Sequence, residues 1–155
     1  METFAELSEG KTIDDGVAQQ WTVARRPEGN VRPDDFGWRE TSIPELEPNE
    51  VLLKTLYLSL APVMRSYMSG QSFAGEAPLQ IGDVLHGRGV AQIVRSRHPE
   101  WFEGQVVQGQ IGWQTYKVSK MTPQEKFRVM PPNGLSASLG LGALGMTGLS
   151  ALAGF

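Results

Sequence analysis

The chain has 155 residues, of which 40% are hydrophobic and 20% charged, a balance typical of one globular domain with its own core. Its net charge of -3 offers no clustered Lys and Arg for phosphates, so we expect no nucleic-acid partner. The lack of cysteine excludes disulfides, thiolate zinc sites and a cysteine nucleophile.

Residues 1–17 form an acidic N-terminal segment. The segment contains five carboxylates and one basic residue, Lys11. Its net charge is therefore -4, and the net charge of the remaining residues is +1. This composition predicts a solvated, disordered tail. The segment also lacks the basic start and apolar run of an export signal, and we therefore expect a cytoplasmic protein.

Short β-prone runs separated by Gly and Pro turns dominate residues 18–133. Strands are predicted at residues 20–24, 36–41, 51–60, 87–96, 105–109, 113–118 and 127–129. One or two helical turns are predicted at 63–69, because Pro62 suits a helix start. No helices alternate with the strands, so the pattern predicts a mainly β fold, a closed or partly closed β-barrel.

From residue 134 the sequence becomes rich in Ala, Leu and Gly, which predicts a helix capped by Ser136 or Ser138. Residues 135–155 carry no charge, and their length alone would allow a membrane span. Five of them are glycine, however, and no basic or aromatic belt flanks them. We therefore expect no membrane partner and a small-residue helix packed against protein.

Residues 140–145 match the dinucleotide fingerprint GxGxxG. That fingerprint works after a strand and with an acidic residue about 20 positions later, and neither is present here. We interpret the match as accidental. Gly142, Gly145 and Gly148 are instead predicted to lie along one side of the helix, where they admit close approach of a backbone or a flat ligand.

No metal site is predicted, because His86 and His98 alone cannot supply the three clustered ligands of a catalytic zinc. His86 precedes Arg88, which is flanked by Gly87 and Gly89. This run fits either a backbone that a ligand approaches or a barrel-edge turn with a surface histidine. No nucleophile elbow and no distinct carboxylate pair are present, so the catalytic residues remain unknown.

Four segments occur in an order and at spacings that resemble one family. They are residues 21–29 (WTVARRPEG), 51–65 (VLLKTLYLSLAPVMR), 87–99 (GRGVAQIVRSRHP) and 141–151 (LGALGMTGLSA). The family is that of the zinc-independent medium-chain reductases, which include prostaglandin/leukotriene, alkenal double-bond and curcumin reductases.

The resemblance implies a GroES-like, partly closed barrel at 18–133 that forms one wall of a substrate cleft. Residues 134–155 would begin the helix that links it to a Rossmann domain, which these 155 residues do not contain. In the family that domain binds NADPH, and hydride passes to the β-carbon of an α,β-unsaturated ketone or aldehyde. The implied partners are therefore NADP and a small enone or enal.

The resemblance also implies site residues. Those at the cofactor are Pro62, Val63, Met146 and Ser150. Those at the substrate cleft are Tyr57, Arg65, His86 and Arg88. Ala61 and Val63 stand where the family has Asp and Tyr, and Thr147 stands for a Pro, so substrate choice need not follow the family's.

Two functions stay open from the sequence. The first is the substrate-side domain of an NADPH-dependent reductase. The alternative is a stand-alone, non-catalytic module that binds a small apolar ligand or a protein partner. In either case the C-terminal helix, with Leu139, Met146 and Leu149 on its face, is expected to mediate self-association into a homo-oligomer.

Overall fold

The computed structural model describes residues 16–72, 75–131 and 134–154. The predicted acidic tail therefore lies outside the described residues except for Gly16 and Val17, and Val17 already begins the first strand.

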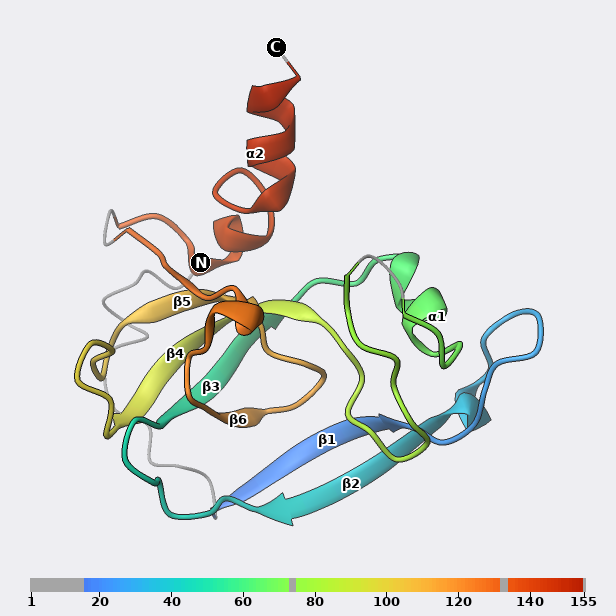
Figure 1. The fold of residues 1–155 in the computed structure, drawn as a ribbon. Coiled ribbons are helices and arrows are strands. Elements are labelled where there is room, and N and C mark those ends of the chain that lie inside the picture. Colours follow the sequence, from blue (N-terminus) through green and yellow to red (C-terminus); the bar gives the residue numbers. More distant parts are fainter. Residues whose placement is uncertain (1–15, 73–74, 132–133, 155) are drawn as a thin grey trace.

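Two antiparallel sheets make up the body of the protein (Figure 1). The smaller sheet pairs β1 (Val17–Val23) with β2 (Phe36–Ser42). The larger sheet has the order β6-β3-β4-β5-β7. Its strands are β3 (Val51–Leu58), β4 (Arg88–Ser96), β5 (Val106–Gln110), β6 (Tyr116–Ser119) and β7 (Arg128–Val129).

The two sheets are joined only locally in the described part of the chain. Isolated bridges link Gln20 of β1 to Gln114, and Thr22 of β1 to Val84. The sheets therefore do not close into a complete barrel. The mainly β, partly closed architecture is confirmed, and the closed form, which the strand pattern also allowed, is wrong.

Strand β3 explains why an unbroken apolar run is stable here. Successive side chains of a strand point to opposite faces. Val51 and Leu53 pack with Ile93 of β4 in one hydrophobic cluster, whereas Leu52 packs with Tyr116 in another. Both faces of the strand are covered at this end, so the consecutive residues Val51, Leu52 and Leu53 are all buried.

The short helix α1 (Val63–Tyr67) lies within the predicted helical turns, and Pro62 is its N-cap. The C-terminal segment differs from the prediction. Ser136 does cap a helix, but this is a 3-10 helix, Ala137–Leu141, and the α-helix α2 (Met146–Ala153) begins later.

The single helix predicted from Ser136 or Ser138 is therefore wrong. Each glycine costs a helix about 1 kcal/mol relative to alanine, and Gly140, Gly142 and Gly145 fall within six residues. The chain breaks at Gly142, which has φ -125° and ψ -111°. The predicted row of glycines does not form either, because only Gly148 lies inside α2.

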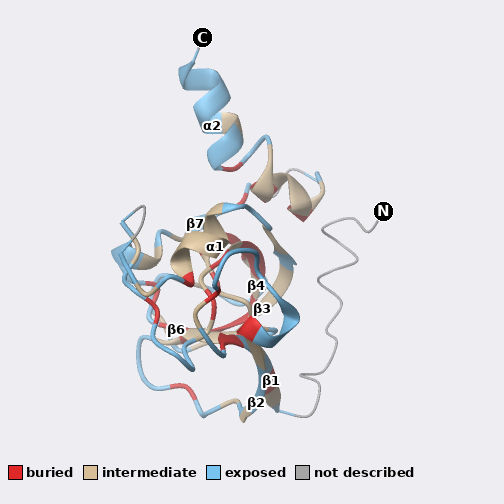
Figure 2. Ribbon diagram, turned by 90° about the vertical axis from the view of Figure 1, so that its right-hand side faces the viewer, coloured by how far each residue is buried: buried red, intermediate tan, exposed pale blue. Residues whose placement is uncertain are grey.

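Helix α2 projects from the two sheets, and none of its residues is buried (Figures 1 and 2). Leu152 has 75% of its surface exposed, and Met146 and Leu149 are about half exposed. Within the described ranges, no helix has both the length and the apolar character needed to cross a membrane.

These burial differences predict that the hydrophobic core depends on β3 and not on α2. Leu53→Ala, at a fully buried position, should lower the free energy of unfolding by about 2–5 kcal/mol. The same truncation at the exposed Leu152 should change it by less than about 0.5 kcal/mol. Urea unfolding of both variants tests this, and equal losses would place α2 in the core.

Candidate functional site

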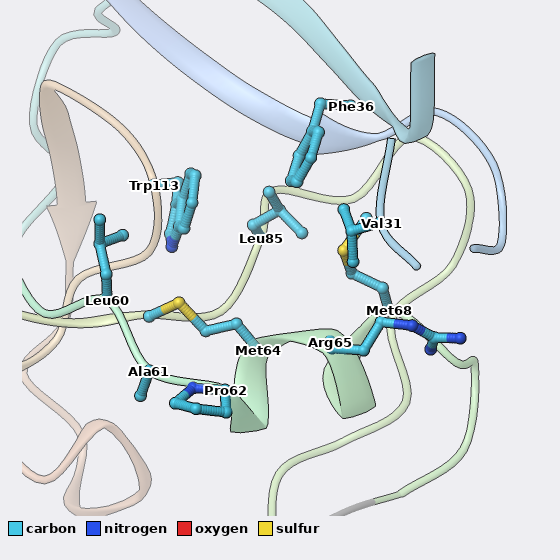
Figure 3. Close-up of a pocket in the computed structure, with 10 residues that line it drawn as sticks. All are labelled: Val31, Phe36, Leu60, Ala61, Pro62, Met64, Arg65, Met68, Leu85 and Trp113. Atoms are coloured by element: carbon cyan, nitrogen blue, oxygen red, sulfur yellow. The ribbon is translucent and has the colours of Figure 1, made fainter. Parts of the chain in front are cut away.

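An apolar pocket of about 420 Å³ opens between α1, the start of β2 and the loops that carry Leu85 and Trp113 (Figure 3). We call it the apolar pocket. It is lined by Val31, Phe36, Leu60, Ala61, Pro62, Met64, Arg65, Met68, Leu85 and Trp113. Nine of these ten side chains are uncharged, so the pocket suits a largely apolar ligand.

The aromatic wall of the pocket consists of Phe36 and Trp113. Their rings are stacked, with centroids 6.0 Å apart and an interplanar angle of 12°. The backbone of Trp113 is held on both sides, because its N–H donates to the carbonyl of Leu85 at 3.0 Å and its carbonyl accepts from Trp21 at 2.9 Å. The indole is thus fixed by tertiary contacts before any ligand arrives.

The opposite wall is α1 and the residues just before it. Arg65, the charged lining residue, donates from its guanidinium to the carbonyls of Pro27 at 2.9 Å and Gly29 at 3.2 Å. Figure 3 shows this group pointing away from Leu60 and Trp113. Arg65 therefore contributes its aliphatic stem to the pocket and its charge to the loop beside it.

A second arginine ties the same loop to the other end of α1. Arg26 donates to the carbonyl of Met68 at 3.0 Å and to that of Leu79 at 2.5 Å. Gly70 provides the space for this guanidinium, since a Cβ at residue 70 would lie 2.7 Å from Cζ of Arg26. Its φ of +81° also favours glycine.

Asp35 holds the turn that carries Val31 and Phe36. Its buried carboxylate accepts the backbone N–H of Arg32 and the Nε of Arg25, both at 2.7 Å. The backbone hydrogen bond from Arg32, followed by the bond from Arg25, lowers the pKa of this carboxyl below its ordinary value of 3.8. Folding therefore favours the ionised form.

The predicted substrate-cleft residues do not share one cavity. Arg65 lines the apolar pocket, but Arg88 lines a separate pocket of about 320 Å³ beside α2. His86 lies elsewhere, with Nε2 3.0 Å from the carbonyl of Ala77 and its ring edge-on to Tyr67. Tyr57 lies on β3, is 37% exposed and lines none of the described pockets.

The predicted cofactor residues also separate into two groups. Pro62 lines the apolar pocket and Val63 follows it as the first residue of α1. Met146 lines the pocket beside α2, where the hydroxyl of Ser150 donates to the Met146 carbonyl at 2.9 Å. The described residues thus offer two separate contact points and no cradle for a whole dinucleotide.

Metal chemistry has no ligand set in the described ranges, where no group of three or more His, Asp or Glu side chains could hold an ion. Charged side chains in the described ranges instead form ion pairs. Beside the apolar pocket, Arg25 and Asp35 approach to 2.7 Å.

The fold and pocket therefore define a mainly β domain that offers an apolar cavity beside α1. The family described as N-terminal domain of oxidoreductase matches residues 19–127. The chain belongs to this family, and the resemblance to zinc-independent medium-chain reductases is confirmed.

The relatives are reductases. The NADPH-dependent curcumin reductase of Escherichia coli (strain K12) is 38% identical over 136 residues, covering 88% of this chain and 38% of the relative. Prostaglandin reductase 1 of Oryctolagus cuniculus is 34% identical over 137 residues, covering 88% and 37%. This chain thus spans well under half the length of these relatives.

A solved structure gives the same fold. CurA from Vibrio vulnificus matches with a TM-score of 0.78 and 33% identity, covering 88% of this chain and 39% of that one. The complex of that protein with NADPH matches with a TM-score of 0.76, 32% identity and the same coverage.

Sequence reasoning identified only Pro62 and Arg65 among the residues that line the apolar pocket. It missed the aromatic wall, Phe36 and Trp113, which was assigned to strands. A signal existed for Trp113, because it follows Gly112, whose φ of +81° makes the turn that sets the indole in place. Without the fold, nothing connected that turn to α1.

The Asp35 contacts predict a pH-dependent stability. A carboxyl whose pKa is lowered by folding stabilises the fold above its unfolded pKa and loses this contribution as pH falls through the folded pKa. Asp35→Asn should therefore lower Tm at pH 7, and the gap to the parent should shrink towards about pH 3.

The neighbouring Asp34→Asn is the matched control, since its side chain is 83% exposed and 3.9 Å from Arg25. Thermal unfolding of the three proteins at both pH values checks the prediction. A gap for Asp35→Asn that stays constant with pH would contradict it.

Proposed function

We propose that this chain is the substrate-side domain of an NADPH-dependent reductase that acts on the C=C bond of α,β-unsaturated ketones or aldehydes. The observation that carries the proposal is the apolar pocket beside Leu60, Ala61 and Pro62, within a fold shared with NADPH-dependent reductases. Its volume of about 420 Å³ is in the range of small-molecule sites.

When bound, NADPH would supply the hydride that reaches the β-carbon of the substrate. The residues of this chain would bind and orient the substrate. Pro62 and Ala61 would present an apolar surface to the reacting end, and Phe36 would hold the apolar part of the substrate. The apolar lining would also keep water from the reacting carbon.

The alternative is a module that binds a small apolar ligand without catalysis. One observation favours it: the lining residues of the apolar pocket include no Asp, Glu, His, Lys or Tyr, so the pocket itself holds no acid or base. Both functions need the pocket to bind ligand, and only the reductase needs that ligand to react.

A hybrid enzyme separates the two functions. Residues 1–155 would replace the matching N-terminal part of the Escherichia coli curcumin reductase, and benzylideneacetone would serve as the enone. We expect consumption of NADPH with benzylideneacetone and none with its saturated counterpart, benzylacetone. Ala61→Phe should lower kcat/KM at least about tenfold, because it fills the pocket and displaces the substrate.

Ser42→Phe, at an exposed position at the end of β2, adds the same ring outside the pocket and should leave kcat/KM unchanged. A folded hybrid that binds both NADPH and the enone without turnover would support the non-catalytic module.

A further prediction concerns self-association. The exposed Met146, Leu149 and Leu152 give α2 an apolar surface without a charge, and proteins seldom leave such a surface uncovered. We expect the chain to associate through α2. Leu149→Lys should shift it towards monomer in sedimentation velocity, with unchanged unfolding.

Ile81→Lys provides the control, since Ile81 is 55% exposed on the loop after α1 and outside α2. A parent chain that is monomeric at high concentration would contradict the prediction.

A further inference from the structure

The indole nitrogen of Trp113 is a buried donor with no hydrogen-bond partner among the residues that the structure describes. Buried polar groups are nearly always hydrogen-bonded, and one that is not is costly to the fold. Because Trp113 also lines the apolar pocket, an acceptor on a bound ligand could satisfy this donor.

The immediate surroundings of this nitrogen are known. A Cβ placed on Gly87 would lie 3.0 Å from Nε1 of Trp113 and 3.8 Å from the Met64 methyl group. Figure 3 shows the nitrogen on the edge of the indole that faces Leu60 and the thioether end of Met64. The donor thus points to the α1 side of the pocket, where the methyl end of Met64 lies nearby.

The side chain of Met64 can change conformation, whereas the indole of Trp113 is held in place. Met64 has an unbranched, flexible side chain that adapts to what packs against it. The indole is fixed by its stacking on Phe36 and by the backbone hydrogen bonds of Trp113. A ligand that displaces the Met64 methyl group would meet a preorganised N–H donor.

We propose that the Trp113 N–H binds the carbonyl oxygen of a neutral ketone or aldehyde in the apolar pocket. This inference rests on the proposed function and adds the group that orients the substrate. The indole N–H can only donate, so it selects an acceptor. A carboxylate fits less well, because Arg65, the charged residue of the lining, is already bonded to the carbonyls of Pro27 and Gly29.

The test uses the chain labelled with nitrogen-15 in its tryptophan side chains, whose indole N–H signals report hydrogen bonding directly. Three probes of similar shape are compared: benzylideneacetone, the diene in which a methylene group replaces its carbonyl oxygen, and cinnamate. We expect a downfield shift of the Trp113 indole proton with benzylideneacetone alone. Cinnamate should bind more weakly than benzylideneacetone.

Trp113→Phe assigns the signal and removes the donor while keeping an aromatic ring against Phe36. It should weaken benzylideneacetone about 2- to 10-fold, the range expected for one hydrogen bond, and leave diene binding unchanged. Trp38→Phe, half exposed and outside the pocket, should alter neither affinity. If Trp113→Phe does not fold, the comparison of probes on the parent chain decides.

The outcomes separate the two proposals. If the ketone and the diene bind equally and the Trp113 proton does not move, the role of Trp113 is overturned while the proposed substrate pocket stands. If cinnamate binds more tightly than the ketone, the preference for a neutral acceptor is overturned. If no probe perturbs any residue of the pocket, both the proposed function and the role of Trp113 fail.

Discussion

The reciprocal bonds between two arginines and backbone carbonyls are the constraint on which the site depends. Arg26 reaches from the loop after β1 to the carbonyl at the end of α1, and Arg65 reaches from α1 back to that loop. Helix α1 has only five residues and no buried side chain, so it has little intrinsic stability. Three charge-assisted hydrogen bonds fix its position instead.

This arrangement also explains how charged residues can build an apolar cavity. A guanidinium group has five donors in a rigid plane and satisfies several carbonyls at once. Both arginines donate to backbone carbonyls around the pocket, and the carboxylate of Asp35 accepts from Arg25 and from the Arg32 N–H. The charges are satisfied within the wall of the pocket, and hydrophobic surface remains on the inside.

The sequence predicted what depends on local signals. The strands at 51–60 and 87–96 are found as β3 and β4 within two residues, because alternation and glycine turns act locally. The helix after Ser136 was predicted too long, since apolar composition was given more weight than three glycines. The pocket could not be predicted, because Phe36 and Trp113 meet only after the two sheets have joined.

The glycines around Arg88 show how a local pattern acquires meaning from the fold. The sequence allowed them to serve a ligand that approaches the backbone. In the structure another part of the chain occupies that space: a Cβ on Gly89 would lie 2.6 Å from the Tyr57 carbonyl, and one on Gly87 would lie 2.8 Å from the Trp113 ring. The absence of a side chain at Gly87 therefore makes space for Trp113 and not for a ligand. By admitting the indole edge, it lets the N–H reach the side of the pocket where α1 begins.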